Sequence, residues 1–147
     1  MNAIFLMEES KNPKSFWRPY FDSLPKNCSM FPVCYNDEEF HLFDGSQLQE
    51  QISLNIDKIK GPYQDLVNSV PGFAQIFSMT EWRDINCMVQ SRSFGIHHDN
   101  SLNNERSLVM VPFCDMMNHS KDYNVEWTYS NEQRGFLMRA TQHIKRG

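Results

Sequence analysis

The sequence predicts an α+β fold in a single domain, on two observations about its periodicity. Apolar side chains recur at three- and four-residue steps through the first two thirds of the chain, a spacing typical of helices with one buried face. Short segments in which apolar and polar residues alternate follow in the last third, a spacing typical of strands. Because the helices and strands are segregated along the chain, the pattern favours α+β over a doubly wound parallel sheet.

The first expected helix is short and carries an aromatic face. Asn12 followed by Pro13 is typical of a helix start, and Ser23-Leu24-Pro25 should close the segment, because proline cannot continue a helix. Between these ends the aromatic residues recur at helical spacing: Phe16, Trp17, Tyr20 and Phe21. We expect this face to pack in the core rather than to bind a ligand.

Two further helices should pack as a pair from Gly45 onward, followed by a third. One apolar face runs through the pair, and Gly61-Pro62 is expected to divide it. The third helix is predicted by Ser78 and Glu81, which match an S-x-x-E capping box, and Gly95 should mark its end. The apolar residues of the pair are Leu48, Ile52, Ile56, Ile59, Tyr63, Leu66, Val67 and Val70, and those of the third helix are Trp82, Ile85 and Val89.

The strand-like segments follow a polar stretch, from His97 to Arg106, that we expect to be an exposed loop. Leu108 to Val111 is a short apolar run. Two alternating segments then flank a turn and predict a β-hairpin, with an exposed edge if pairing strands are missing. Their apolar residues are Val125, Trp127 and Tyr129, then Phe136, Met138 and Ala140, with the turn at Asn131 to Gly135.

Composition limits the classes of partner. The 147 residues carry 18 acidic and 14 basic side chains, for a formal net charge of −4, and no stretch gathers Lys or Arg on one face. The sequence therefore predicts no basic surface that could bind a phosphate backbone, and we expect no nucleic-acid partner. The longest apolar run, Leu108 to Cys114, is far shorter than the roughly 20 residues that cross a bilayer, so we also expect no membrane span.

The cysteines indicate a reducing compartment. They are scattered without a CxxC pair, which favours free thiols over a disulfide framework or a zinc site: Cys28, Cys34, Cys87 and Cys114. The apolar run from Ala3 to Met7 is too short for a signal peptide and lacks a basic leader. We therefore expect a cytoplasmic or nuclear protein, and the sequence leaves an organelle open.

The segment from Val111 to Ser120 departs most from plain packing. Asp115, Asn118 and His119 would share one face of a single helical turn, and Asn118 with Ser120 could end that turn by binding free backbone groups. On spacing alone it fits either a capped turn with a hydrogen-bonded histidine or a functional site. A Ser/His/Asp triad does not fit, because neighbours on one turn cannot align as nucleophile, base and orienter. 

A metal site could be read in His97-His98-Asp99, but we expect none. Adjacent histidines rarely converge on one ion, and the surrounding Asn and Ser residues favour a solvated loop.

The run VPFCDMMNHS resembles the Asn-His motif of SET-domain protein methyltransferases, in the class similar to the Rubisco large-subunit lysine methyltransferase and the actin-histidine methyltransferase. Ser15 to Tyr20 with Leu24-Pro25 resembles the S-x-W-x-P-Y…L-P segment of that class, and Gln90 to Phe94 resembles its S-R-x-F helix end. The hairpin and Ile144 to Gly147 resemble the strands that lead into its Tyr-Gly segment. The resemblance implies a partial SET domain over residues 1–147, with a helical insert at about 12–95 and a strand core at about 108–147.

The resemblance also implies an activity and a site. The activity is transfer of a methyl group from S-adenosyl-L-methionine to a lysine or histidine nitrogen of a protein substrate. In the family, the residue matching Asn118 accepts from the cofactor's amino group, and the one matching His119 meets the adenine through its backbone. Arg92 would face the cofactor's carboxylate, and Asp115 would orient this group or contact the cofactor.

Two parts of the family pattern do not occur in the chain. There is no Gly-x-Gly segment, which we expect upstream of Met1, and the family's catalytic tyrosine is expected beyond Gly147. Tyr123 and Tyr129 precede its position, so no catalytic residue is assigned. An alternative is therefore open, a non-catalytic SET-like module that binds other proteins. Neither the substrate, the degree of methylation nor the oligomeric state is set by the sequence.

Overall fold

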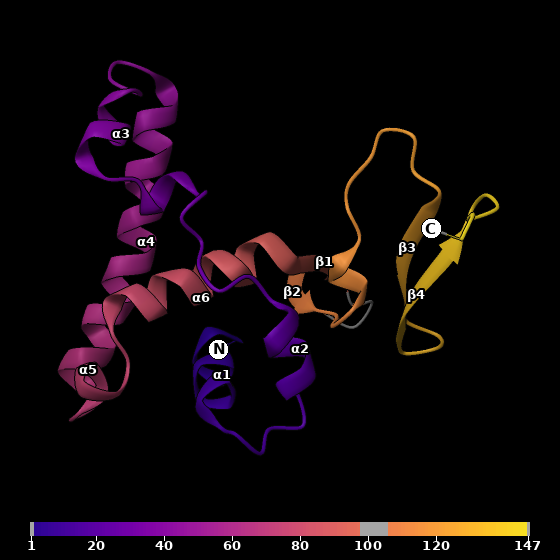
Figure 1. Ribbon diagram of the computed structural model, residues 1–147, viewed down its shortest axis with the longest axis horizontal. Helices are drawn as coiled ribbons and strands as arrows, with labels where there is room; N and C mark the ends of the chain where they lie inside the picture. The colour runs from indigo at the N-terminus through magenta and orange to yellow at the C-terminus, as the bar shows by residue number, and fades with distance from the viewer. Residues whose placement is uncertain (1, 98–105, 147) are drawn as a thin grey trace. The chain divides into compact units, whose positions relative to one another are not determined.

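Helices occupy the first part of the chain and strands the last, which Figure 1 shows in the change from indigo and magenta to orange and yellow. The structure, a computed structural model, describes residues 2–97 and 106–146. The chain divides into a helical unit, Met1–Ser91, and a strand unit, Arg92–Gly147. The mixture of helices and short antiparallel strands confirms the α+β prediction.

The helical unit is a set of short helices around one long helix. The helices and the 3-10 turn of this unit are α1 (Asn2–Lys11), α2 (Arg18–Ser23), η1 (Pro32–Cys34), α3 (Asp37–His41), α4 (Gln47–Ser69), α5 (Phe73–Ile76) and α6 (Met79–Arg92), whose last residue belongs to the strand unit. None of the helices among the described residues is long and apolar enough to cross a membrane. The helix α1 was not predicted, and it buries Leu6 and Met7.

The aromatic helix is shorter than the sequence predicted. It begins at Arg18, because Asn12 accepts a hydrogen bond from the Lys14 backbone N–H and forms a turn between α1 and α2. Its end before Pro25 is confirmed. The expectation that the whole aromatic face is buried was wrong: Tyr20 is buried, but Phe16 is 84% exposed and only meets the edge of Trp17.

Helix α4 is continuous where the sequence predicted two helices. Pro62 lies inside it, although its ring nitrogen cannot donate the hydrogen bond that the Lys58 carbonyl would accept. The neighbouring carbonyl, of Ile59, accepts a 2.8 Å hydrogen bond from the indole N–H of Trp82. Packing of Trp82 against this part of α4 therefore offsets the cost of the proline, and the predicted break at Gly61-Pro62 was wrong.

The core of the helical unit surrounds Trp82. Its ring lies 6.3 Å from that of Tyr63 and 6.4 Å from that of Phe73, centroid to centroid. Rings in such tilted and edge-on contacts attract each other beyond the area they bury. The buried residues of this core are Met7, Cys28, Ile59, Phe73, Trp82 and Cys87.

Helix α6 begins as predicted and ends earlier. Glu81 accepts from the Ser78 backbone N–H at 2.8 Å, and the Ser78 hydroxyl accepts from the Glu81 backbone N–H at 3.2 Å, which confirms the capping box. The helix ends at Arg92, and Gly95 lies inside a strand, so the prediction of Gly95 as the helix stop was wrong. Gly95 leaves room for the side chain of Arg106 on the neighbouring strand, which a Cβ at this position would meet.

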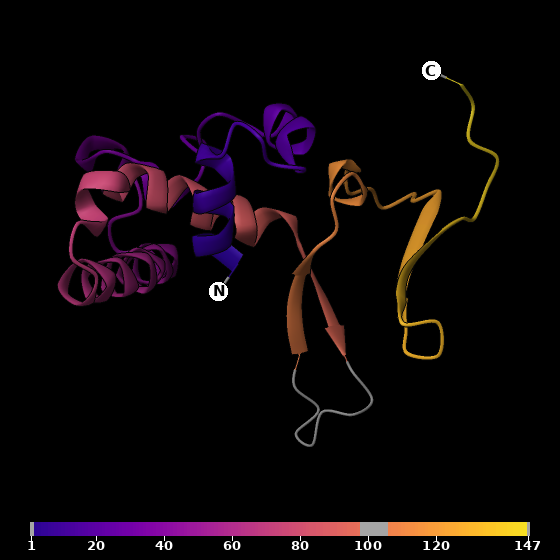
Figure 2. The ribbon, with the colours of Figure 1, turned by 90° about the horizontal axis from the view of Figure 1, so that it is seen from below.

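Within residues 92–97 and 106–146, the strand unit contains two antiparallel pairs (Figure 2). The pairs are β1 (Ser93–His97) with β2 (Arg106–Met110), and β3 (Val125–Ser130) with β4 (Gly135–Ala140), with the 3-10 turn η2 (Cys114–Met116) between them in sequence. The second pair confirms the predicted hairpin, in the register Trp127 opposite Met138. Phe94 of β1 contacts Trp127 and Phe136 with ring centroids 5.0 and 4.7 Å away. Of the expected loop, residues 98–105 lie outside the described residues.

Candidate functional site

The Asn-His segment follows a partly exposed turn after the end of β2. After Pro112, Phe113 adopts φ 69°, which is rare for a residue with a side chain. The chain then enters η2, in which the Asp115 backbone N–H donates to the Val111 carbonyl at 3.1 Å. Backbone conformations of this kind cost on the order of 1 kcal/mol or more, and they persist where surrounding contacts hold them.

An ion pair holds this turn to the end of α6. Nη1 of Arg92 donates to the backbone carbonyl of Asp115 at 3.1 Å and lies 3.3 Å from the carboxylate Oδ2 of the same residue. The Asp115 side chain is 0% exposed and the Arg92 side chain 20% exposed. A buried carboxylate needs such a cation, because desolvation otherwise penalises its charge. The structure therefore brings two of the four predicted site residues, Arg92 and Asp115, into contact.

The other two predicted residues lie just beyond the turn. Asn118 and His119 are exposed, and neither side chain forms a hydrogen bond with another described residue. The prediction that Asp115, Asn118 and His119 share one helical turn was wrong, because η2 ends at Met116 and Met117 is already extended. Ser120 does not cap that turn either; its hydroxyl accepts from the Asp122 backbone N–H at 3.2 Å. The amide of Asn118 and the ring of His119 therefore lie at the surface of the strand unit as the structure describes it.

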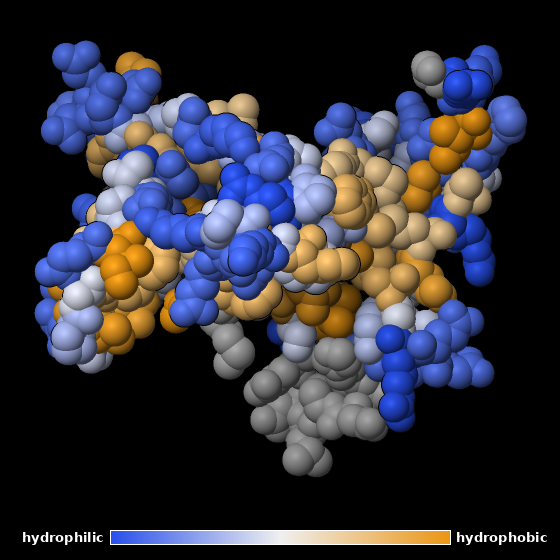
Figure 3. Space-filling view, turned by 60° about the horizontal axis from the view of Figure 1, so that its bottom comes forward, coloured by the Kyte–Doolittle hydropathy of each residue, from blue (hydrophilic) through white to orange (hydrophobic). Residues whose placement is uncertain are grey.

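Apolar side chains are exposed on the same unit. Phe113, Tyr123 and Trp127 are 62%, 59% and 42% exposed. Figure 3 shows orange, apolar atoms at the surface of this unit among blue, polar ones. Isolated exposed apolar residues are ordinary, but aromatic ones beside polar groups are typical of binding surfaces.

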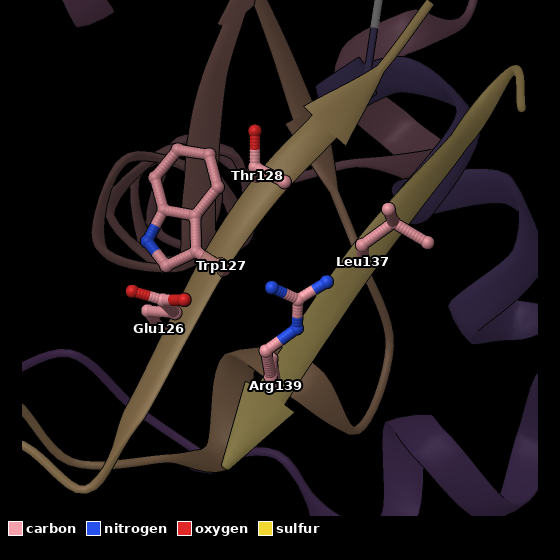
Figure 4. A pocket seen from close by; sticks show the side chains of 5 residues that line it. All are labelled: Glu126, Trp127, Thr128, Leu137 and Arg139. Carbon is pink, nitrogen blue, oxygen red and sulfur yellow. The ribbon is translucent and has the colours of Figure 1, made fainter. Parts of the chain in front are cut away.

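A hollow on the hairpin does not include any predicted site residue. It has a volume of about 270 Å³ and lies on the face of β3 and β4 where Glu126 and Arg139 stand opposite each other in the register (Figure 4). Thr128 and Leu137 form the next pair along this face. Because none of its lining residues belongs to the predicted set, the hollow does not extend the candidate site.

No metal centre can be built from the described residues. Across residues 2–97 and 106–146, His, Cys, Asp and Glu side chains form no group of three that could hold a metal ion. His98 and Asp99 of the sequence-suggested set lie outside these ranges, and His97 is the last residue of β1.

Comparison with known families shows which family the chain belongs to. The sequence model of the family described as "SET domain" matches residues 2–147. The chain belongs to the SET-domain family. This SET chain is 28% identical over 154 residues to human N-lysine methyltransferase SETD6, an alignment that covers 98% of the chain and 32% of that protein. It is 26% identical over 138 residues to the chloroplastic ribulose-1,5 bisphosphate carboxylase/oxygenase large subunit N-methyltransferase of Nicotiana tabacum, covering 90% of the chain and 26% of that protein.

A solved structure supports the fold of the SET chain. The SET domain of LSMT, solved with lysine and AdoHcy, superposes with a TM-score of 0.68 at 23% sequence identity, over 82% of this chain and 27% of that one. At this identity the match establishes the fold. The SET chain spans about a third of the length of the curated relatives that it matches first, 32% in the human one.

The sequence predicted the candidate residues of the site but not all of the structure that positions them. The four candidate residues were predicted from the Asn-His and S-R-x-F motifs, and their roles stay predictions. Strand β1 was missed, because Ser93 to His97 is five residues long and contains a glycine. The pairing of Arg92 with Asp115 was foreseen only as one of two options, since 23 residues separate them and only the fold brings them together.

Proposed function

We propose that this SET chain is part of an S-adenosyl-L-methionine-dependent protein N-methyltransferase that acts on lysine. The observation that carries the proposal is the guanidinium of Arg92, held by Asp115, together with the exposed Asn118 and His119, whose side chains form no hydrogen bond with the described part of the chain. The printed names of the curated relatives support a protein lysine as acceptor. The family match over residues 2–147 supports treating both units as parts of one SET domain.

The residues present fit the cofactor's polar groups. Arg92 uses Nη1 for Asp115, and its Nε and Nη2 form no hydrogen bond with other described residues, so these two nitrogens can both donate to a carboxylate. The side-chain carbonyl of Asn118 can accept from an ammonium group, and the backbone at His119 can meet an adenine edge. When bound, the cofactor supplies a methyl group activated on a sulfonium.

The described residues of the chain do the binding and orienting. Asp115 fixes one edge of the Arg92 guanidinium, so the side chain is already immobilised before a ligand arrives. Less conformational entropy is then lost on binding. Methyl transfer depends mainly on holding donor and acceptor in line, so fixed positions matter more than acid-base chemistry. We assign no catalytic residue within the chain.

The partners follow from the same chemistry. We propose a protein substrate and no nucleic acid, because the net charge is −4 and the chain has no basic cluster. The cysteines Cys28, Cys34, Cys87 and Cys114 are free, which supports a cytoplasmic or nuclear location.

Thermal unfolding with and without S-adenosylhomocysteine tests the proposal. At a ligand concentration of 100 times Kd, binding adds about 2.7 kcal/mol to the free energy of unfolding and raises Tm by a few degrees. The shift should be lost in Asn118→Ala and kept in Asn124→Ala, a matched control in which an exposed asparagine of the same unit is removed. A cooperative transition that does not move at saturating ligand would contradict the proposal and favour the protein-binding module.

A further inference from the structure

The hollow on the hairpin brings opposite charges to one face of β3 and β4. Glu126 and Arg139 are directly opposite each other in the register, and both line the hollow. Thr128 and Leu137 form the next pair on that face, and Trp127 completes the lining. The hollow therefore combines a cation, an anion, a hydroxyl group and apolar side chains within a few residues.

The two charged side chains of the hollow do not pair with each other. Opposite charges that face each other across two strands normally attract. Here, however, neither Glu126 nor Arg139 forms an ion pair with any residue that the structure describes. Figure 4 shows the Arg139 guanidinium between the two strands and the Glu126 carboxylate beside β3, away from β4. Both groups therefore keep their hydrogen-bonding capacity for a molecule outside the described part of the chain.

The size and the lining of the hollow limit what it can hold. Its volume is about 270 Å³, below the range of about 300–1,000 Å³ typical of pockets that enclose a drug-sized molecule. Two of its lining residues, Trp127 and Arg139, are of the types that contribute most to binding at protein–protein interfaces. Volume and lining thus favour a few side chains of another protein over a small organic ligand.

Aromatic contacts hold one wall of the hollow in place. The ring of Trp127 stacks on that of Phe136 at 5.2 Å between centroids, with 15° between the ring planes. The ring of Phe94, in β1, meets Trp127 edge-on at 5.0 Å. A side chain that is already immobilised loses little conformational entropy when a partner binds. The Trp127 wall is therefore set before a partner arrives.

The two charges select the chemistry of the partner. The planar guanidinium of Arg139 can bind a carboxylate through two parallel N–H groups. A free anion at that place would be repelled by the nearby carboxylate of Glu126. A partner that carries a basic group beside its carboxylate satisfies both side chains. In an extended peptide, side chains two positions apart lie on the same face, so an acidic and a basic residue separated by one residue present such a pair.

We propose that the hollow binds an extended segment of a partner protein in which an acidic and a basic residue are separated by one residue. The acidic side chain binds Arg139. The basic side chain binds Glu126 and packs its apolar stem against the lining of the hollow. This proposal does not depend on the proposed methyltransferase activity, because none of the lining residues is a candidate cofactor residue.

Fluorescence anisotropy with a labelled peptide tests the proposal. The probe is fluorescein-labelled Gly-Ser-Glu-Ser-Lys-Ser-Gly, and a second peptide has Glu in place of Lys. The 147-residue chain is titrated into each at low ionic strength without cofactor. The mixed-charge probe should bind saturably, and Arg139→Gln should weaken it about tenfold, the effect of losing a hydrogen bond between charged groups. Arg134→Gln and Glu132→Gln are matched controls that remove the same charges from the turn of this hairpin, outside the lining, and should leave the affinity unchanged.

A change of specificity separates recognition from a structural role. Glu126→Gln should weaken binding of the mixed-charge probe and strengthen binding of the peptide with two glutamates, because the repulsion is gone. Absence of saturable binding would overturn the proposal, as would equal binding of the probe by Arg139→Gln and the unaltered chain. Displacement of the probe by free lysine or glutamate at an equal concentration would overturn it in favour of a small zwitterionic ligand. The Tm shift with S-adenosylhomocysteine should persist in Arg139→Gln, so the two proposals fail separately.

Discussion

The ion pair between Arg92 and Asp115 is the contact on which the candidate site depends most. Arg92→Met removes the cation and both of its hydrogen bonds while keeping a long apolar stem, and Asp115→Asn removes the negative charge while keeping the shape. Hydrogen bonds to charged groups contribute about 1.5–3 kcal/mol each. Since the Asp115 carboxylate is 0% exposed, Arg92→Met also leaves a buried charge without this cation. We expect it to cost about 3 kcal/mol.

Asp115→Asn should lower the free energy of unfolding by less than Arg92→Met, because it weakens only one of the two contacts between these residues. In Asp115→Asn the contact from Arg92 to the backbone carbonyl remains, at 3.1 Å, and only the charged contact at 3.3 Å is weakened. We expect a cost of about 1–2 kcal/mol. In the double variant the two costs should overlap, with a coupling free energy of about 1.5 kcal/mol.

Urea unfolding of the four proteins in this cycle gives the coupling, and hydrogen exchange shows where it acts. Faster exchange in Arg92→Met should be confined to the turn at η2, whose amide N–H groups donate within the turn. Arg83→Met is the matched control, because Arg83 lies in the same helix and pairs with Asp84 rather than with the turn. Additive costs, within about 0.5 kcal/mol, would refute the reasoning, because independent residues behave in that way.

Two further predictions concern the stability of the helical unit. Hydrogen bonds from Lys11 and Ser78 lower the pKa of Glu81 to about 2, so the stabilisation is present above the ordinary value of 4.5 and is lost as the pH falls from there toward 2. Glu81→Gln should flatten that part of a plot of unfolding free energy against pH. The change should be no more than about 1 kcal/mol, because the Lys11–Glu81 ion pair is half exposed. An unchanged slope would show that Glu81 does not cause this pH dependence. Trp82→Phe removes the donor to the Ile59 carbonyl and should lower the free energy of unfolding in urea by about 2–3 kcal/mol, whereas an unchanged midpoint would show that this hydrogen bond does not hold α4 together.

Local patterns predicted those elements that local contacts form. The hairpin of β3 and β4 was found because alternation and a short turn specify it within a few residues. The start of α6 was found because Ser78 and Glu81 satisfy each other's backbone groups three residues apart. Both devices act over a few residues, so a single sequence is enough to show them.

Elements that distant contacts decide were predicted wrongly or missed. The break expected in α4 follows correctly from the chemistry of Pro62, yet the indole of Trp82 binds α4 beside it, 23 residues from Ile59 in sequence. Strand β1 depends on pairing with β2, and Gly95, which resembles a helix stop, is there because Arg106 lies against it. Gly95 and Pro62 thus indicated positions with an unusual backbone requirement. They did not show whether that requirement was a helix end, a helix interior or a strand.

The candidate site couples three elements through one residue. Arg92 is the last residue of α6, and β1 begins at the next residue, Ser93, so no linker separates the helix end from the strand. The same Arg92 side chain holds η2 through Asp115. Since η2 follows β2 and β2 pairs with β1, these contacts close a loop: helix end, strand pair, turn, and back to the helix end. A change that loosens the pairing of β1 with β2 should therefore also release the Arg92 side chain from its position. The affinity for any ligand that binds the Arg92 guanidinium should then fall.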